Sequence, residues 1–416
     1  MDLSSPILVV AVGLILVRWA AENWLDGLNE RQVRKHAGGV PEELAGVMDG
    51  DTYAKSVDYT LAKSRFGTLE NLFDTGLLLV VLLSGFLPWL FETSATLLGG
   101  SVWSNAAYLI GVMLAMSAVR LPIDWLEQFR LEERFGFNNS TQATWWIDRV
   151  KGVLLLVILL LPIFALLLKL IDWAGDAWWV WGWASLIGIQ FLMMVLAPIV
   201  ILPLFNKFTP LEDGPLKDRL MALAGRTQFD AREIQVMDGS RRSKHSNAFF
   251  TGFGKGRRIV LFDTLIEQLD EAELEAVLAH EIGHYKRRHV LKMLAVSALS
   301  MLAGFWVLSL LLEYEPFAAA FGFEAENPTP AFLLFGLLSG AVEFWLSPLM
   351  NRLLRKHEYE ADAFAKGVVG SAKPLSSALR KLHEKNLGNL TPHPTYSGFH
   401  YSHPTLLERE AALASG

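Results

Sequence analysis

Seven long apolar stretches restrict the folds open to this chain more than any other feature. They cover residues 5–25, 76–97, 103–123, 150–171, 178–204, 290–313 and 330–351. Each is long enough to cross about 30 Å of hydrocarbon as a helix, and within lipid only helices and closed barrels satisfy the backbone hydrogen bonds. A hydrophobic content of 52% and a mean hydropathy of +0.31 are typical of a membrane protein. The sequence therefore predicts a mainly helical bundle of seven transmembrane helices in a lipid bilayer.

The basic residues predict how this bundle is oriented. The linkers 98–102, 172–177 and 314–329 contain no Lys or Arg, whereas segments 26–75, 124–149, 205–289 and 352–416 hold nearly all of the 37. The positive-inside rule places the basic segments in the cytosol. The chain then divides into helices one to five with their loops (1–204), a cytosolic part (205–289), helices six and seven (290–351) and a second cytosolic part (352–416).

A pair of histidines marks the first cytosolic part as a candidate metal site. The segment 280–284 reads His-Glu-Ile-Gly-His, and positions i and i+4 of a helix share one face, so both rings can reach one zinc ion. Glu281, between them, can take a proton from a water held by the metal. Residues 271–279 favour a helix, and Gly283 allows another element to pack closely. The alternative is a surface helix with two incidental histidines.

A zinc site of this kind needs a third protein ligand, and Glu358 is the best candidate. Glu358 and Asp362 are also i and i+4 in a helical segment that follows the last apolar stretch. Asp362 can then accept a hydrogen bond from the distal nitrogen of a ligand histidine. Glu360 lies about 200° around the helix from Glu358 and is expected to face elsewhere. The alternative is a solvated run of charges, which most such runs are.

Short strands are predicted on either side of a possible substrate-binding segment. Residues 232–237 and 258–262 have strand patterns, and between them lie Asn247, Ala248 and Phe249. A substrate peptide can add to such an edge strand through backbone hydrogen bonds, although an ordinary hairpin strand fits the pattern as well. The two cytosolic parts together hold about 150 residues, enough for one α+β catalytic domain. The chain has no cysteine, which excludes thiol chemistry and Cys ligands, and no basic stripe with interleaved aromatics that would indicate nucleic acid.

Several longer motifs resemble one family, the CAAX prenyl protease 1 family of integral-membrane zinc metalloproteases. The matching segments are Pro-Glu-Glu-Leu at 41–44, Lys-Ser-Arg-Phe at 63–66, Glu-Arg-Phe-Gly-Phe-Asn at 133–138, the run 205–213, His-Ser-Asn-Ala-Phe at 245–249, the zinc motif, Glu-Tyr-Glu-Ala-Asp at 358–362, His-Tyr-Ser-His-Pro at 400–404 and Leu-Leu-Glu-Arg at 406–409. The resemblance covers nearly the whole chain.

This resemblance implies roles that the patterns alone do not. The family has seven helices around a water-filled intramembrane chamber, with a gluzincin-like zinc site at its cytosolic end. By position, His280, His284 and Glu358 match the zinc ligands, and Glu281 matches the catalytic glutamate. Asn247 matches a residue that holds the substrate backbone, and His403 one that stabilises the oxyanion. Taken without the family, the preferred interpretation of His403 is a helix-capping or packing residue before Pro404.

Departures from the family bear on the substrate. The connection between Asn247 and His280 is shorter than expected of eukaryotic members, and the last residues, 411–416, lack a dilysine-type signal. We therefore expect a bacterial homologue in the inner membrane, or an endoplasmic reticulum protein if the source is eukaryotic. Three hypotheses follow: a peptidase for prenylated CAAX-type peptides, a quality-control peptidase for membrane proteins, and a seven-helix receptor or transporter. The presence of Glu281 together with Glu358 and Asp362 argues against the third, because a transporter has no need of a catalytic glutamate between two metal ligands. Glu343, inside the last span, either lines a chamber or pairs with another helix.

Overall fold

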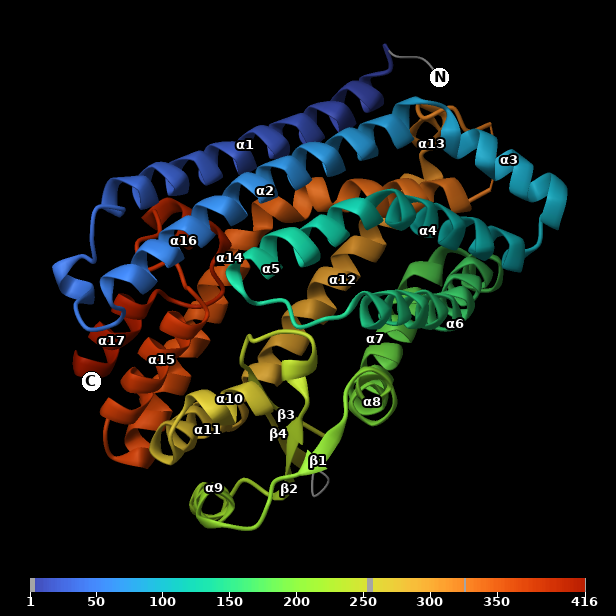
Figure 1. Ribbon diagram of the computed structural model, residues 1–416. Coiled ribbons are helices and arrows are strands. Elements are labelled where there is room, and N and C mark those ends of the chain that lie inside the picture. The colour runs from blue at the N-terminus through green and yellow to red at the C-terminus, as the bar shows by residue number, and fades with distance from the viewer. Residues whose placement is uncertain (1–3, 253–256, 325–326, 416) are drawn as a thin grey trace.

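A computed structural model describes residues 4–252, 257–324 and 327–415 of this mainly helical protein (Figure 1). Among these residues, six helical stretches are long and apolar enough to cross a membrane. They are Pro6–His36, Gly50–Leu83, Val102–Phe135, Gln142–Phe205, His289–Glu313 and Thr329–Val369. The prediction of a helical membrane protein is confirmed.

The fourth stretch accounts for the difference between six and the seven predicted spans. It contains two long helices, α6 (Gln142–Ala174) and α7 (Trp178–Leu196), with a single 3₁₀ turn (η3, Gly175–Ala177) between them. The predicted spans 150–171 and 178–204 fall in these two helices, and the second continues through η4 (Ala197–Ile201) and α8 (Leu202–Phe205). The two helices also pack against each other.

The predicted second span, 76–97, is wrong as a single helix. The apolar sequence is divided between α2 (Gly50–Leu83) and α3 (Phe86–Leu98). Gly85 adopts a left-handed conformation with φ of 76°, which glycine tolerates and which ends the regular helix. Hydropathy alone continues smoothly across this break and does not reveal it.

The last membrane helix extends far beyond its apolar part. α14 (Thr329–Val369) has 41 residues and is about 62 Å long at 1.5 Å per residue, twice the hydrocarbon thickness. The predicted span 330–351 and the acidic segment 355–362 are therefore one continuous helix. Glu343 is exposed on α14, so a buried pairing with another helix is not observed.

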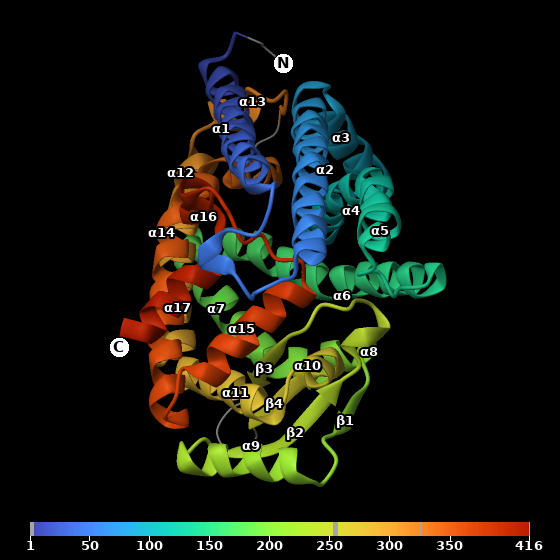
Figure 2. The same ribbon diagram turned by 60° about the vertical axis from the view of Figure 1, so that its left-hand side comes forward.

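A four-stranded sheet lies at one end of the helical layer (Figure 2). Its order is β1 (Phe208–Pro210), β2 (Ala231–Met237), β4 (Arg257–Phe262) and β3 (Ala248–Thr251). β2 and β4 are parallel, and β3 is antiparallel to β4 at the edge. The strands predicted at 232–237 and 258–262 are confirmed. The segment after Asn247 is both an edge strand and one arm of a β3–β4 pair.

One hydrophobic core joins the two predicted cytosolic parts. It includes Leu223, Ile259 and Leu278 from the first part and Ala365 and Leu375 from the second. Helices α9 (Pro215–Arg226), α10 (Asp263–Gln268), α11 (Glu271–Lys286) and α15 (Lys373–Lys385) surround the sheet.

The other elements are α1 (Pro6–His36), η1 (Glu42–Leu44), α4 (Val102–Leu126), η2 (Glu127–Glu132), α5 (Glu133–Phe135), η5 (Gly239–Arg241), α12 (His289–Glu313), α13 (Pro316–Ala319), α16 (Pro394–His400) and α17 (Leu406–Ser415).

Candidate metal centre and active site

Helix α11 carries the two histidines, and its sequence explains both of its ends. Asp270 accepts hydrogen bonds from the first turn while Glu273 bonds back to the Asp270 backbone, a capping box that starts the helix. Leu274, Leu278 and Ile282 are buried in the core. The helix stops just before Arg288, whose φ is 57°, and α12 begins at the next residue. The remaining face of α11 is left to present its histidines to α14.

Gly283 allows α14 to approach this face closely. A Cβ atom placed on Gly283 would lie 3.1 Å from both the Cα and the carbonyl oxygen of Ala361, tighter than ordinary carbon contacts. Ala361 itself is fully buried. The absence of a side chain at Gly283 therefore brings the α14 residues next to Ala361 within reach of the histidines, as expected from the sequence.

Three ligand-type side chains converge at this crossing. The Nε2 atoms of His280 and His284 are 3.1 Å apart, and Glu358 oxygens lie 3.4 Å from the first and 3.2 Å from the second. Ligands about 2.1 Å from a tetrahedral zinc ion lie about 3.4 Å from one another, so these spacings fit a single ion. Glu358 is 6% exposed, and its Oε2 has no hydrogen-bond partner among the described residues. A cation would compensate this buried oxygen.

Asp362 lies one turn beyond Glu358 and contacts the back of His280. Its Oδ1 is 2.8 Å from His280 Nδ1. Because a carboxylate accepts, the proton of the neutral ring belongs on Nδ1, and the Nε2 lone pair points toward Glu358 and His284. This leaves His280 in the tautomer that a metal ligand requires.

Glu281 and His403 lie beside the three ligand-type residues. Glu281 lines the same cavity as His280 and Glu358, and burial raises the pKa of its carboxyl above the ordinary value. His403 Nε2 is 3.5 Å from Glu358 Oε1, and its Nδ1 is 2.9 Å from the Ser402 hydroxyl. The residue is exposed and lines the same cavity.

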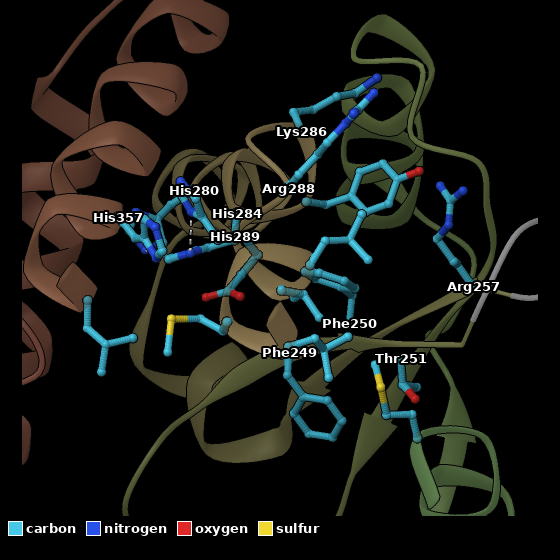
Figure 3. A pocket seen from close by; sticks show the side chains of 18 of the residues that line it. Phe249, Phe250, Thr251, Arg257, His280, His284, Lys286, Arg288, His289 and His357 are labelled. Atoms are coloured by element: carbon cyan, nitrogen blue, oxygen red, sulfur yellow. Dashed lines mark hydrogen bonds between the residues drawn. The ribbon is translucent and has the colours of Figure 1, made fainter. Parts of the chain in front are cut away.

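A cavity of about 1130 Å³ extends from these residues (Figure 3). The histidines of α11 lie on one side, and Phe249 and Phe250 of β3 lie on another. The cavity reaches the membrane helices through residues of α7 and α12, including Met194 and Leu294. The cavity thus connects the polar residues His280, His284 and Glu358 to an apolar wall formed by side chains such as Met194 and Leu294.

The three residues predicted to bind substrate occupy different positions at the start of β3. Asn247 is exposed just before the strand, and its Oδ1 accepts a hydrogen bond from the Ala248 amide at 2.8 Å. Ala248 is buried in the domain core, so it offers a substrate only its backbone. Phe249 lines the cavity.

Sequence reasoning missed a buried arginine from the last helix. The Arg409 guanidinium donates to Asp362 at 2.8 Å and 2.5 Å and lies 3.7 Å from Glu358 Oε2. Side-chain exposures of 9% for Arg409 and 2% for Asp362 show a desolvated pair. The motif at 406–409 carries a family resemblance, but nothing in its spacing indicates that Arg409 has a partner 47 residues upstream.

Long apolar helices and a His-Glu-x-x-His helix crossed by an acidic helix define a membrane-embedded metallopeptidase. Two family models agree with this class: "CAAX prenyl protease N-terminal, five membrane helices" matches residues 29–207, and "Peptidase family M48" matches residues 210–415. Among curated relatives, the CAAX prenyl protease 1 homolog of Oryza sativa subsp. japonica is 34% identical over 419 residues, 99% of this chain and 98% of that protein. CAAX prenyl protease 1 of Saccharomyces cerevisiae is 36% identical over 90% of this chain and 88% of that protein. The chain belongs to the CAAX prenyl protease 1 family.

A solved structure agrees over the same length. The crystal structure of S. mikatae Ste24p matches with a TM-score of 0.91 and 34% identity, covering 99% of each chain. The alignment with the rice protein also corrects one expectation. It covers nearly all of both chains over 419 positions, so the rice protein has no long insert between the counterparts of Asn247 and His280, and the short connection does not distinguish this chain from that relative.

Proposed function

We propose that this protein is a zinc endopeptidase that cleaves near the C terminus of prenylated CAAX-type or similar substrates. The observation that carries the proposal is the mutual spacing of 3.1–3.4 Å among the ligand atoms of His280, His284 and Glu358. Zinc suits a site of two imidazoles and one carboxylate with an open fourth position.

The side chains around the metal site supply proton transfer, stabilisation of the oxyanion and orientation of a ligand ring. When bound, zinc supplies a water of lowered pKa and polarises the scissile carbonyl. Glu281 takes a proton from the attacking water and delivers it to the leaving amine. His403 donates a hydrogen bond from Nε2 to the oxygen that becomes negative during attack. Asp362 holds the His280 ring in its ligand tautomer.

The edge strand and the apolar wall support a lipidated peptide as substrate. β3 is the last strand of its sheet among the described residues, so its outer edge could pair with a peptide backbone. Asn247 immediately precedes this strand, and Ala248 and Phe249 begin it, so these residues would meet the peptide backbone. Met194 and Leu294 line the part of the cavity nearest the membrane helices, where an isoprenoid chain would lie. The relatives named CAAX prenyl protease 1 support the same substrate class.

We further propose seven membrane crossings around a chamber, with the metal centre on the cytosolic side. α6 and α7 are counted as separate crossings because η3 interrupts the stretch between them. The basic segments share the side that carries the α11–α14 crossing, as the positive-inside rule requires. The further expectation of a bacterial inner membrane rests on the sequence alone.

The test uses the purified full-length protein in detergent, with Glu281→Gln beside the wild type. We expect one zinc per chain in both proteins, because the three ligands remain, and cleavage of a prenylated CAAX reporter peptide by the wild type only. The general base accounts for a loss of about 100- to 10,000-fold. Zinc with no cleavage by the wild type would refute the substrate class, and unfolded membrane proteins would be tested next. A protein without zinc would refute the mechanism.

A further inference from the structure

A third histidine lies directly behind the metal ligand His284. His289, the first residue of α12, is 3% exposed, and its Nδ1 is 3.0 Å from His284 Nδ1. The opposite ring nitrogen, Nε2, is 3.0 Å from Glu360 Oε2. Figure 3 shows His284 and His289 side by side at the wall of the cavity. Three groups from α11, α12 and α14 thus form one continuous hydrogen-bonded series.

Only one arrangement of protons satisfies this series while His284 binds a metal. A carboxylate accepts but does not donate, so the proton shared with Glu360 belongs to His289 Nε2. Neutral His289 then has a lone pair on Nδ1, which accepts the Nδ1 proton of His284. His284 Nε2 is left with its lone pair directed at Glu358, 3.2 Å away.

The reverse arrangement removes the metal ligand. If the His289 proton lay on Nδ1 instead, it would be donated to His284 Nδ1, the His284 proton would occupy Nε2, and the His289 Nε2 lone pair would face the Glu360 carboxylate. His284 Nε2 could then no longer coordinate. The observed geometry therefore does for His284 what Asp362 does for His280, with one imidazole inserted between the carboxylate and the ligand ring.

Neighbouring groups hold His289 and Glu360 in place. The His289 ring stacks on His357 with centroids 4.0 Å apart and an interplanar angle of 12°. Lys292 lies 3.6 Å from the Glu360 carboxylate, and its charge favours the ionised, accepting form of that carboxylate. Glu360 does face away from Glu358, as expected from the helix, but it approaches the metal centre from behind.

We propose that Glu360 and His289 are positioning residues that fix the tautomer and orientation of His284 for metal binding. The proposal rests on the proposed zinc site and deepens it, because it assigns the group that orients the second histidine. It concerns binding of the metal itself, so it can be measured without substrate. Groups of this kind typically change metal affinity by about 10- to 100-fold.

The test is zinc affinity of the full-length protein in detergent, measured by competition with a chromophoric chelator. Glu360→Ala and His289→Leu should each raise the dissociation constant for zinc about 10- to 100-fold. Because both changes break the same series, the double variant should bind about as weakly as the weaker single variant, not at the product of the two effects. Thermal unfolding of the metal-free proteins shows whether each variant is folded.

Two further variants separate positioning from simple packing. His289→Asn places a carbonyl oxygen near the former Nδ1 and should bind zinc more tightly than His289→Leu. Lys356 lies 3.9 Å from Glu360 Oε1 with its side chain 72% exposed, so Lys356→Gln removes only a surface charge beside Glu360 and should bind zinc like the wild type. Wild-type affinity in Glu360→Ala, or losses that multiply in the double variant, would overturn the positioning role. A wild type that binds no zinc would instead overturn the proposed function.

Discussion

Replacing Gly283 by alanine tests whether the α11–α14 approach determines the metal geometry. The new Cβ would lie 3.1 Å from Ala361 Cα and 3.2 Å from Phe364 Cδ1, whereas carbon atoms prefer about 3.5–4.0 Å. The two helices must then separate by about 0.5 Å. Metal–ligand distances tolerate about 0.2 Å, so a shift of this size pulls Glu358 on α14 away from the histidines on α11.

The expected magnitude follows from two opposing contributions. Overpacking a core costs about 1–3 kcal/mol, and the better helix propensity of alanine returns about 1 kcal/mol. The net cost at the helix crossing is about 0–2 kcal/mol, and its midpoint of about 1 kcal/mol corresponds to zinc binding that is roughly 5-fold weaker, with an upper limit of roughly 30-fold. The assay is chelator competition on the full-length protein, with thermal unfolding of the metal-free form alongside.

Gly367 provides a matched control on α14. A Cβ there meets no atom within 4 Å, so Gly367→Ala should leave zinc affinity unchanged and stabilise the protein slightly. If Gly283→Ala binds zinc as tightly as this control, the close approach does not set the ligand geometry, and the reasoning is refuted.

Three other changes probe the same centre. His403→Leu should lower kcat about 100- to 1,000-fold through loss of an oxyanion donor while zinc content stays at one per chain; an equal loss of zinc would show that His403 is instead a ligand. Burial lowers the pKa of His280, but the Asp362 and Glu358 carboxylates raise it to about 9 in the metal-free protein. Zinc must displace that proton, so its affinity should fall about tenfold for each pH unit below 9, and a flat titration would contradict this. Arg409→Leu removes the guanidinium from Asp362 in the interior and leaves this carboxylate, among the described residues, only its contact with His280, which should cost about 3–5 kcal/mol of unfolding free energy. An exposed pair would cost less than about 1 kcal/mol, and a loss of unfolding free energy that small would show that the pair is solvated.

The sequence predicted the parts of this site that depend on helix periodicity. His280 and His284 share a face because they are four residues apart, and the same spacing relates Glu358 to Asp362 on α14. The strands around Asn247 were predictable because their patterns are local. Periodicity does not say which distant helices cross, so the place of Arg409 beside Asp362 could not be derived.

The misplaced second span has a different origin. Averaged hydropathy depends on composition, and the composition of 76–97 is predominantly apolar, with apolar residues on both sides of Gly85. The break at Gly85 depends on one backbone conformation, φ of 76°, that only the packed structure selects. Glu360 shows a related limit: its direction on the helix was predicted, but His289 comes from α12, so the contact between them depends on tertiary packing.

The arrangement of the ligands couples the metal centre to the membrane helices. Glu358 lies on α14, which continues without a break from its apolar portion, and the histidines lie on α11, which joins α12 through Arg287 and Arg288. A metal bound between α11 and α14 therefore fastens together two elements that are each continuous, or nearly so, with a membrane helix. The hydrogen bond between Glu360 and His289 adds a second connection near the metal site, this time between α14 and α12, and His289 also contacts His284. Because metal binding energy is also folding energy for the elements that supply the ligands, removing the metal should loosen this junction first. The sheet should be affected later, because Ile234 and Ile259 are buried in the hydrophobic core that it shares with α11 and α14.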